Sequence, residues 1–553
     1  MAKRKEDGAF RFSRRGFLKT GLAGGAAAML PTFSAAGKSG VTSLPATVIE
    51  PSELEDVSIA ELQEGMRTGK YTARSLAEKY LERIDEIDKE GPALHGIIEL
   101  NPDALDIADA LDKERKEKGE RSPMHGIPIV IKDNLDTADK MATTAGSLAL
   151  VGSKPPSDSF AVQQLRRAGA VILGKTNLSE WANIRSGHST SGWSGRGGLT
   201  KNPYALDRNT SGSSSGTAAA VSANLCAAGV GTETDGSIVS PSSINGLVGI
   251  KPTVGLVSRT GVIPISHTQD TPGPMARSVR DAATLLGALT GVDPEDKATA
   301  ASKGKTEPDY TKFLDAKGLQ GARIGVVRSY FGFHEEVDVL MNRALETLKQ
   351  QGATLIDPVE IKSFSQMGDA ETIVLQHELK ADLNAYLARL GPNAPVHTLK
   401  EIIEFNEKNK KSEMPYFGQD FFVKSEAKGD LKSKEYLAAL AKCRKLSRKE
   451  GIDAALKKHK LDALVAPTDS PAWLTDLVDG DHFLGGSSSA AAVAGYPSIT
   501  VPAGFVFGLP VGISFFAGAW SEPKLIKLAY AFEQATKFRK PPQFLPTVIV
   551  AVE

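Results

Sequence analysis

Apolar residues recur at two spacings along the first part of the chain, and each spacing predicts a different kind of element. After Thr72, a candidate N-cap, apolar positions follow the helical period and predict a long amphipathic helix. A shorter helix is expected to begin at Ser58, which has capping-box spacing to Glu61. A third helix is expected over 101–118, with Pro102 at its first position.

A continuous apolar run at 127–131 follows these helices and is typical of a strand covered on both faces. This strand ends at Lys132. Further along, residues 169–176 match the phosphate-loop pattern, with two glycines and a lysine at the required places. The residues between the two glycines are Ala, Val, Ile and Leu, which is strand composition, and a helical segment precedes them. We therefore expect a helix, a glycine cap and a strand here rather than a nucleotide site.

The second half of the chain alternates between helical and strand-like patterns, as α/β proteins do. The Thr-Pro-Gly-Pro segment at 271–274 predicts a turn. The stretch 330–460 is more charged than the rest and mainly helical. Helices are expected at 279–289, 335–351, 371–390, 434–458 and 523–537, and strands at 322–327, 463–468, 498–502 and 511–515.

Small residues and hydroxyl groups are concentrated between residues 209 and 257. A Gly/Ser loop at 211–216 leads into an apolar small-residue run at 217–230, and a second loop is expected at 231–237. Glycine lets a backbone approach a ligand closely, and successive loop amides aimed at one point can stabilise a developing oxyanion. The pattern therefore predicts a hydrolytic site built largely from backbone.

The segment 212–216 also satisfies the G-x-S-x-G elbow of α/β-hydrolases, but that elbow requires a strand directly before it. The preceding segment, 204–210, is polar and predicts a loop. No histidine downstream has an evident triad context, and ordinary surface or core positions are expected for all of them: His267, His334, His377, His397, His459 and His482.

Composition limits the class of protein. The chain has 553 residues, of which 41% are hydrophobic, and 66 Lys+Arg balance 66 Asp+Glu. Without a basic field, nucleic acid is not an expected partner. Cys226 and Cys443 are expected to be buried small hydrophobes, although export would permit a disulfide. His377-Glu378 lacks the second histidine of a zinc motif and the sequence holds no cysteine cluster, so no metal is expected.

The N-terminus has the layout of an export signal. Residues 1–19 hold seven Lys or Arg against two acidic residues, a net charge of +5, and include the twin arginines Arg14 and Arg15. The mildly apolar run at 21–30 is too short to span a bilayer. The small residues at 34–36 predict cleavage there, a mature chain from about residue 37, and a periplasmic or secreted location reached through the twin-arginine export machinery. A disordered basic tail is the alternative.

Three segments together resemble the core of the amidase signature family of serine hydrolases: GSSSG at 212–216, GTETDGSIVSP at 231–241 and GLVGIKPT at 246–253. The lysine segment at 125–134 and the residues TTAGS at 143–147 complete the pattern. The resemblance runs from about residue 58 to about residue 540 and is weak in the middle. It implies an α/β fold with a large mixed twisted sheet flanked by helices on both faces, in a single domain over 37–553 with a less family-like insertion around 330–460. It implies no cofactor.

The resemblance also implies roles for single residues. Ser237 would be the nucleophile, Ser213 a relay serine held by a cis peptide bond, and Lys132 the base. A serine hydroxyl attacks only when a neighbour accepts its proton, and lysine can accept a proton only if it is neutral, hence buried. The oxyanion hole would consist of the backbone amides of Thr234, Asp235, Gly236 and Ser237. The alternatives are a structural, ion-paired Lys132 and serines that only cap helices and turns.

This chain departs from the usual family pattern at several positions. Ser211 and Ser215 stand where glycine is usual, and Asp235 stands where glycine is common. Val239 replaces an arginine and Glu233 an aspartate. The segment GTETDGSIV is most similar to the peptide amidase branch, which removes ammonia from C-terminal peptide amides. A carboxylate in the oxyanion hole must avoid the developing charge and could bind a substrate N–H or a cationic group.

The leading hypothesis is an exported amidase that hydrolyses a carboxamide to a carboxylate and ammonia through an acyl-enzyme. Two other classes share the scaffold: the amidase subunit of a tRNA-dependent amidotransferase, and a catalytically silent binding protein. Residues 471–473 and 480–483 are candidates for pocket lining. No membrane-anchoring helix is expected.

Overall fold

A mixed sheet of eleven strands runs through residues 52–548, the part of the chain that the computed structural model describes. In the sheet, β2 pairs in parallel with β3 and β6, and β9 pairs in parallel with β10 and β11, whereas the other neighbours are antiparallel. In spatial order the strands are β1 (Ile97–Leu100), β3 (Val171–Thr176), β2 (Pro128–Lys132), β6 (Ala228–Glu233), β8 (Thr271–Ala276), β7 (Val248–Lys251), β12 (Ser498–Val506), β13 (Leu509–Phe516), β11 (Ala463–Pro467), β9 (Arg323–Val326) and β10 (Thr354–Ile356).

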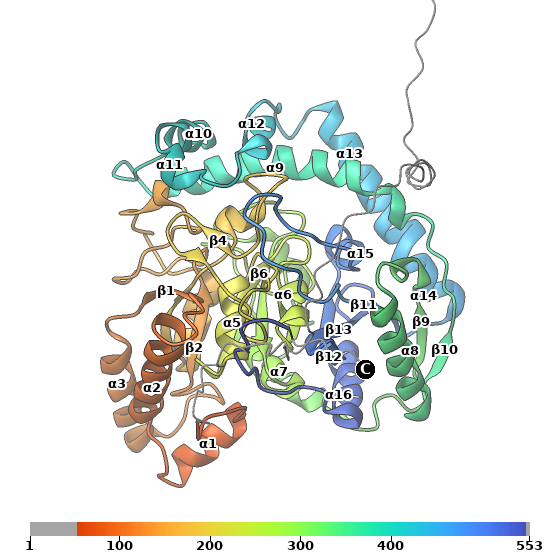
Figure 1. Cartoon of the computed structure of the whole chain (residues 1–553), viewed down its shortest axis with the longest axis horizontal. Helices are drawn as coiled ribbons and strands as arrows, with labels where there is room; N and C mark the ends of the chain where they lie inside the picture. The colour runs from red at the N-terminus through yellow and green to blue at the C-terminus, as the bar shows by residue number, and fades with distance from the viewer. Residues whose placement is uncertain (1–51, 549–553) are drawn as a thin grey trace, which may run out of the picture. The chain divides into compact units, whose positions relative to one another are not determined.

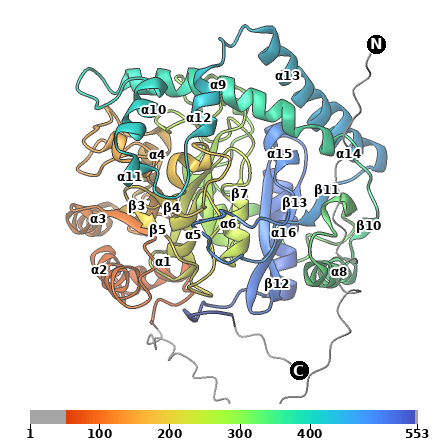
Figure 2. The same cartoon turned by 45° about the horizontal axis from the view of Figure 1, so that its top comes forward.

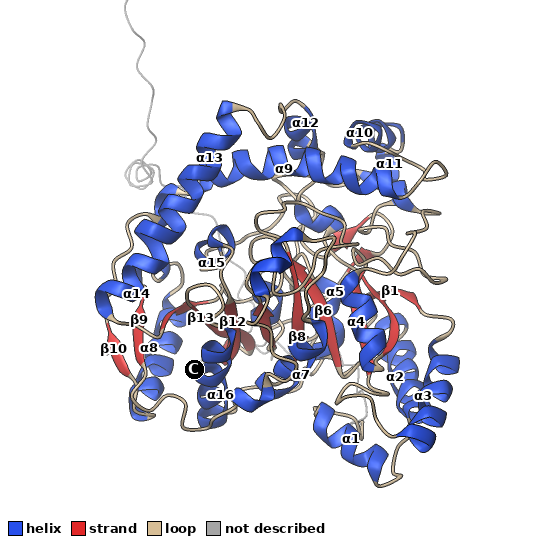
Figure 3. Cartoon of the chain, turned by 180° about the vertical axis from the view of Figure 1, so that it is seen from behind, coloured by secondary structure: helices blue, strands red, loops and turns tan. Residues whose placement is uncertain are grey.

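Helices flank this sheet on both faces, so the predicted α/β class is confirmed (Figures 1 and 3). α5 and α6 contact the central strands, whereas α7, α8 and α16 form a second group that packs on the sheet. The helices are α1 (Ile59–Arg67), α2 (Ala73–Arg83), α3 (Ala104–Lys118), α4 (Phe160–Ala168), α5 (Ser215–Ser222), α6 (Val239–Ile244), α7 (Val279–Leu289), α8 (Glu335–Gln350), α9 (Gly368–Arg389), α10 (Leu399–Lys408), α11 (Lys410–Glu413), α12 (Asp420–Glu426), α13 (Lys434–Arg444), α14 (Asp453–His459), α15 (Ser489–Ala494) and α16 (Glu522–Thr536).

Local signals in the sequence place several of these elements correctly. Ser58 and Glu61 form the predicted capping box of α1, and Thr72 caps α2. The segment that matches a phosphate loop is the end of α4, a cap at Gly169 with φ +86°, and β3, as expected. α7 has the predicted bounds.

Other predictions of local structure were wrong. The Thr-Pro-Gly-Pro segment is not a turn but the start of β8. This strand pairs with β6 from Thr271 to Met275 but with β7 only at Met275 and Ala276, so Pro272 and Pro274 lie where the strand has a partner on one side only. The predicted loop at 231–237 begins later, because β6 continues to Glu233.

Helix boundaries needed correction as well. α3 begins at Ala104, after Pro102 rather than with it. The single helix expected over 434–458 is broken into α13, a π-helical segment (Lys445–Ile452) and α14. The short strands β1, β7 and β10 were not predicted, because three or four residues carry too little periodicity.

The helical stretch around 330–460 is anchored to the sheet's loops through α9. Leu379, Leu383 and Leu387 of this helix pack with Trp181 and Phe422 in one buried cluster. In Figure 2, α9 and α13 pass above α5, α6 and α15. Within residues 52–548, no helix has the length and apolar character needed to cross a membrane. Both cysteines are buried free thiols.

Candidate active site

Lys132 is the last residue of β2 and lies fully buried at the carboxyl end of the parallel strands. Its amine nitrogen lies 2.8 Å from Ser213 Oγ. The other two partners both belong to Thr232 on the neighbouring strand β6: the carbonyl oxygen at 3.2 Å and Oγ1 at 3.0 Å. Ligand sites of open α/β sheets commonly lie outside the carboxyl ends of strands, as this one does.

The surroundings of Lys132 favour a neutral amine. Burial lowers its pKa from 10.5 to about 7, although the carboxyl groups of Asp270 and Glu233 act in the opposite direction. A neutral amine has two N–H donors and one lone pair. In the structure Nζ donates to Ser213 Oγ and to both oxygens of Thr232. If the neutral amine keeps its two N–H donors on Thr232, its lone pair faces the Ser213 hydroxyl. Lys132 has no direct ion pair in the described residues, and its neighbour Asp133 bonds Thr144 and Arg196 instead.

Ser213 is held by the Gly/Ser loop that precedes α5. The Gly212–Ser213 peptide bond is cis, as the family resemblance implied. A Cβ at Gly212 would lie 2.2 Å from Ser179 Oγ, so any larger residue there would force that side chain to move. The Ser213 carbonyl accepts a hydrogen bond from the Ser179 N–H at 3.1 Å. As expected, no strand precedes the loop, so the G-x-S-x-G elbow is not present.

The turn at 234–237 joins β6 to α6 and carries Ser237, which is 9% exposed. Gly236 has a φ of +83°, a backbone conformation that favours glycine. The Ser214 N–H donates to the Ser237 carbonyl at 3.2 Å, which ties the two serine loops together. Among the hydrogen bonds of residues 52–548, none joins the hydroxyls of Ser213 and Ser237 directly.

Carboxyl groups fix this turn from several sides. Glu233 accepts hydrogen bonds from the N–H groups of Ile238 and Val239, at 2.8 and 2.9 Å. The Thr234 hydroxyl donates to Asp270 Oδ1 at 2.6 Å. The Asp235 carboxylate accepts from the hydroxyls of two residues at the start of α15, Ser488 at 2.5 Å and Ser489 at 2.6 Å.

A cavity of about 200 Å³ opens beside the two serine loops. Gly212 and Gly236, the neighbours of Ser213 and Ser237, line it. Trp473 and Phe483 lie in its wall, as predicted for 471–473 and 480–483. The lining includes three carboxyl groups and no lysine or arginine; its members are Asn183, Ser191, Ser211, Gly212, Asp235, Gly236, Ser240, Thr468, Asp469, Trp473, Asp481, Phe483, Gly486 and Ser488.

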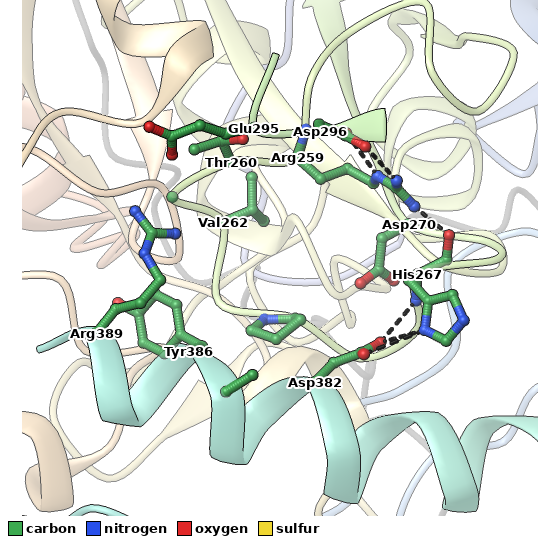
Figure 4. Close-up of a pocket in the computed structure, with 13 residues that line it drawn as sticks. Arg259, Thr260, Val262, His267, Asp270, Glu295, Asp296, Asp382, Tyr386 and Arg389 are labelled. Atoms are coloured by element: carbon green, nitrogen blue, oxygen red, sulfur yellow. Dashed lines mark hydrogen bonds and ion pairs between the residues drawn. The ribbon is translucent and has the colours of Figure 1, made fainter. Parts of the chain in front are cut away.

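A second cavity, of about 240 Å³, lies between α9 and the loop 259–270 (Figure 4). Asp270 lines it and also binds Thr234, so this loop reaches from the cavity to the turn that carries Ser237. His267 stands between two carboxylates of α9, with Nδ1 2.8 Å from Asp382 and Nε2 3.5 Å from Glu378. Each ring nitrogen faces a different carboxylate, an arrangement that favours the protonated imidazole, because both nitrogens can then donate.

The sequence motifs predicted Lys132, Ser213 and residues 234–237 as site residues but gave no indication of the side chains that surround them. Thr232 belongs to the motif at 231–241, but nothing in the sequence indicated that it contacts Lys132. Asp270 and Glu371 come from a loop and a helix far along the chain, and no sequence pattern marks them as neighbours of the turn. Only the fold brings them together.

Comparison with known proteins defines the class. Residues 75–526 match the model of the Amidase family, and the chain therefore belongs to that family. It is an amidase, a hydrolase of carboxamide C–N bonds. Residues 11–31 match the model of the TAT (twin-arginine translocation) pathway signal sequence, so the N-terminus carries a signal for export across the membrane.

Individual relatives agree with this assignment. The chain is 44% identical to a probable amidase of Arabidopsis thaliana over 501 residues, which cover 89% of this chain and 92% of the relative. The crystal structure of native peptide amidase from Stenotrophomonas maltophilia superposes with a TM-score of 0.85 at 50% identity, covering 89% of this chain and all of that one. A glutamyl-tRNA(Gln) amidotransferase subunit of Halorhodospira halophila is 33% identical over 500 residues, 87% of this chain and 98% of the relative.

Proposed function

We propose that this amidase removes ammonia from amidated peptide C-termini, with Ser237 as nucleophile, Ser213 as proton relay and Lys132 as base. The observation that carries the proposal is the buried Lys132 amine, which lies 2.8 Å from Ser213 Oγ and makes its other two contacts with Thr232. Its pKa of about 7 makes the neutral form available at neutral pH.

In the first half-reaction, Ser237 Oγ attacks the amide carbon while its proton passes to Ser213 and the Ser213 proton passes to Lys132. The carbonyl oxygen becomes an oxyanion, which the N–H groups of residues 234–237 stabilise. When the C–N bond breaks, Lys132 returns a proton through Ser213 to the leaving nitrogen, and ammonia departs. A water molecule then attacks the acyl carbon, and its proton passes through Ser213 to Lys132. The proton returns through Ser213 to Ser237 Oγ as the acyl bond breaks, which releases the carboxylic acid and restores Ser237.

The charge of the cavity supports an uncharged amide terminus as substrate. Asp235, Asp469 and Asp481 line the space beside the serine loops, and no cation of the lining offsets them. A peptide that ends in a carboxamide brings no negative charge to this place, whereas the product ends in a carboxylate and is repelled. Similarity to the Stenotrophomonas maltophilia peptide amidase points to the same substrate class. The greater identity to that enzyme than to the amidotransferase subunit favours free hydrolysis over transfer to tRNA.

The export signal supports a location outside the cytoplasm, in the periplasm or the medium, for a protein that folds before transport. We propose cleavage after residues 34–36 and a mature single domain from about residue 37, without metal or cofactor and without a nucleic-acid partner. The reaction above needs none of these, because the proton carriers and the oxyanion donors all belong to the chain.

The test is a mass-spectrometric comparison of amidated peptides, simple aliphatic amides and acyl ethanolamides with the mature enzyme. We expect conversion of the amidated peptides to acids with release of ammonia, and a loss of at least about 10⁴-fold in kcat for Ser237→Ala. A fluorophosphonate should label the wild-type enzyme at Ser237 and leave the variant unlabelled. An enzyme that hydrolyses no amide but retains a small ligand would instead be a binding protein.

A further inference from the structure

Glu371, in the first turn of α9, lies against the turn that carries Ser237. Its side chain is buried, with 9% exposure, and its carboxyl group lies next to the carboxyl group of Asp235, close enough for the two to share a hydrogen bond if one of them carries a proton. Gln269 Nε2 bridges the two segments, since it lies 3.0 Å from Glu371 Oε1 and 3.2 Å from the Thr234 carbonyl oxygen. Helix α9 thus lies against Asp235 through the Glu371 carboxyl group and is linked to Thr234 through the side-chain amide of Gln269.

Two carboxyl groups that share a hydrogen bond must hold a proton between them, because two carboxylates at that distance repel each other. Within residues 52–548, no lysine, arginine or histidine nitrogen forms an ion pair with either group. Asp235 accepts bonds from the hydroxyls of Ser488 and Ser489, which stabilise its charge. Glu371 accepts only the bond from Gln269, so the proton belongs on Glu371.

The wider surroundings agree with this assignment. Burial raises the pKa of Glu371 well above its usual range, and the neighbouring charge of Asp235 raises it further. The other titratable groups that act on the pair are Lys251, Glu233, Tyr330 and Cys443. The one cation among them, Lys251, favours the charged form of Asp235.

We propose that Glu371 is a positioning residue of the amidase site: as a neutral carboxylic acid it donates a hydrogen bond to the Asp235 carboxylate and so holds the turn whose N–H groups receive the oxyanion. The inference rests on the proposed role of residues 234–237. An ionised Glu371 would break this bond and add a second negative charge beside an oxygen that becomes negative in the transition state. The shared proton therefore keeps the turn in place and prevents a second negative charge beside the oxyanion hole.

The proposal predicts a descending alkaline limb in the pH dependence of kcat, as the carboxyl pair loses its proton. Glu371→Gln keeps both contacts, because an amide can accept from Gln269 and donate to Asp235. We expect this variant to stay within about threefold of the wild-type kcat and to lose the alkaline fall. Glu371→Ala loses the contacts, and its kcat should drop about tenfold with KM within about threefold, since the turn acts on the transition state.

Glu378→Gln is the matched control. Glu378 is a buried carboxylate on the same helix, but it accepts its bonds from Tyr436 (2.7 Å), Ser266 and Thr268 (2.9 Å), faces His267, and has no hydrogen bond to residues 234–237. This variant should keep the alkaline fall. If Glu371→Ala does not fold, as judged by circular dichroism and thermal melting, the role of Glu371 is tested by comparing the alkaline fall of kcat in Glu371→Gln and Glu378→Gln.

The rate of fluorophosphonate labelling at Ser237 separates this inference from the proposed function. The rate should fall with Glu371→Ala and recover with Glu371→Gln. A wild-type enzyme that is labelled at Ser237, together with a Glu371→Gln variant that is as slow as Glu371→Ala or that retains the alkaline fall, would overturn the role of Glu371 alone. An enzyme in which Ser237 is never labelled would overturn the proposed nucleophile, and this inference with it.

Discussion

The amine of Lys132 lies 3.0 Å from the hydroxyl oxygen of Thr232, and the Asn134 side-chain amide donates to the same oxygen at 2.9 Å. Thr232 therefore supplies two of the three contacts that orient the Lys132 amine. Thr232→Val removes this acceptor but keeps the size and shape of the side chain. We expect kcat to fall about tenfold, because the amine can rotate away from Ser213. Thr232→Ser keeps the hydroxyl and serves as the control; equal kcat values for the two variants would contradict this role.

The protonation of Lys132 should limit activity at acidic pH. Because burial lowers its pKa to about 7, the amine is charged below that pH and cannot accept a proton. We expect kcat/KM for a neutral substrate to rise about tenfold per pH unit below the midpoint and to level off above it, until the alkaline fall expected from the Asp235–Glu371 pair begins. A profile measured between about pH 5 and pH 9 tests this prediction. A flat acidic side would show that Lys132 is not the base.

The ion pairs of His267 should stabilise the protein more at acidic than at alkaline pH. Burial disfavours the charged ring, yet the hydrogen bond and charge of Asp382, together with the charge of Glu378, raise the pKa of His267 above its usual value. The folded pKa then exceeds the unfolded one, so the contribution is complete below the unfolded pKa and is lost as pH rises through the folded pKa.

The measurement for His267 is the difference in melting temperature between the wild-type protein and His267→Gln, from pH values below the unfolded histidine pKa to values above the folded one. The difference should be largest at acidic pH and should shrink toward alkaline pH. The side chain is 41% exposed, so the effect is modest. A difference that grows with pH would indicate that the ring acts as a neutral group.

The acidic cavity should discriminate against anionic substrates, and more strongly as pH rises. Burial raises the pKa of Asp469 to about 7, so this group gains its charge as pH increases through neutrality. The ratio of kcat/KM for a neutral peptide amide to that for a peptide amide with an acidic side chain should increase up to about tenfold between pH 6 and pH 8. Asp469→Asn should weaken this pH dependence. A ratio that does not change with pH in the wild-type enzyme would contradict the prediction.

Much of the fold was predictable because its signals are local. Ser58 and Glu61 form a capping box within one turn, and the end of α4 with Gly169 and β3 follows from composition over a few residues. The Pro-Gly-Pro segment in β8 was not predictable in this way. Whether a proline can occupy a strand depends on whether a neighbouring strand requires its missing N–H, and that is a property of the whole sheet.

The sequence by itself determined the chemical inventory of this protein: a lysine at the end of an apolar strand, serines in glycine-rich loops, and an N-terminal export signal. Those features depend on residue type and short spacing. Only the tertiary structure decided the state of these groups, because burial and contacts between distant segments control their protonation. The desolvation of Lys132, its orientation by Thr232, and the proton shared by Asp235 and Glu371 arise where strand ends, a turn and a distant helix meet, and no local pattern encodes that meeting.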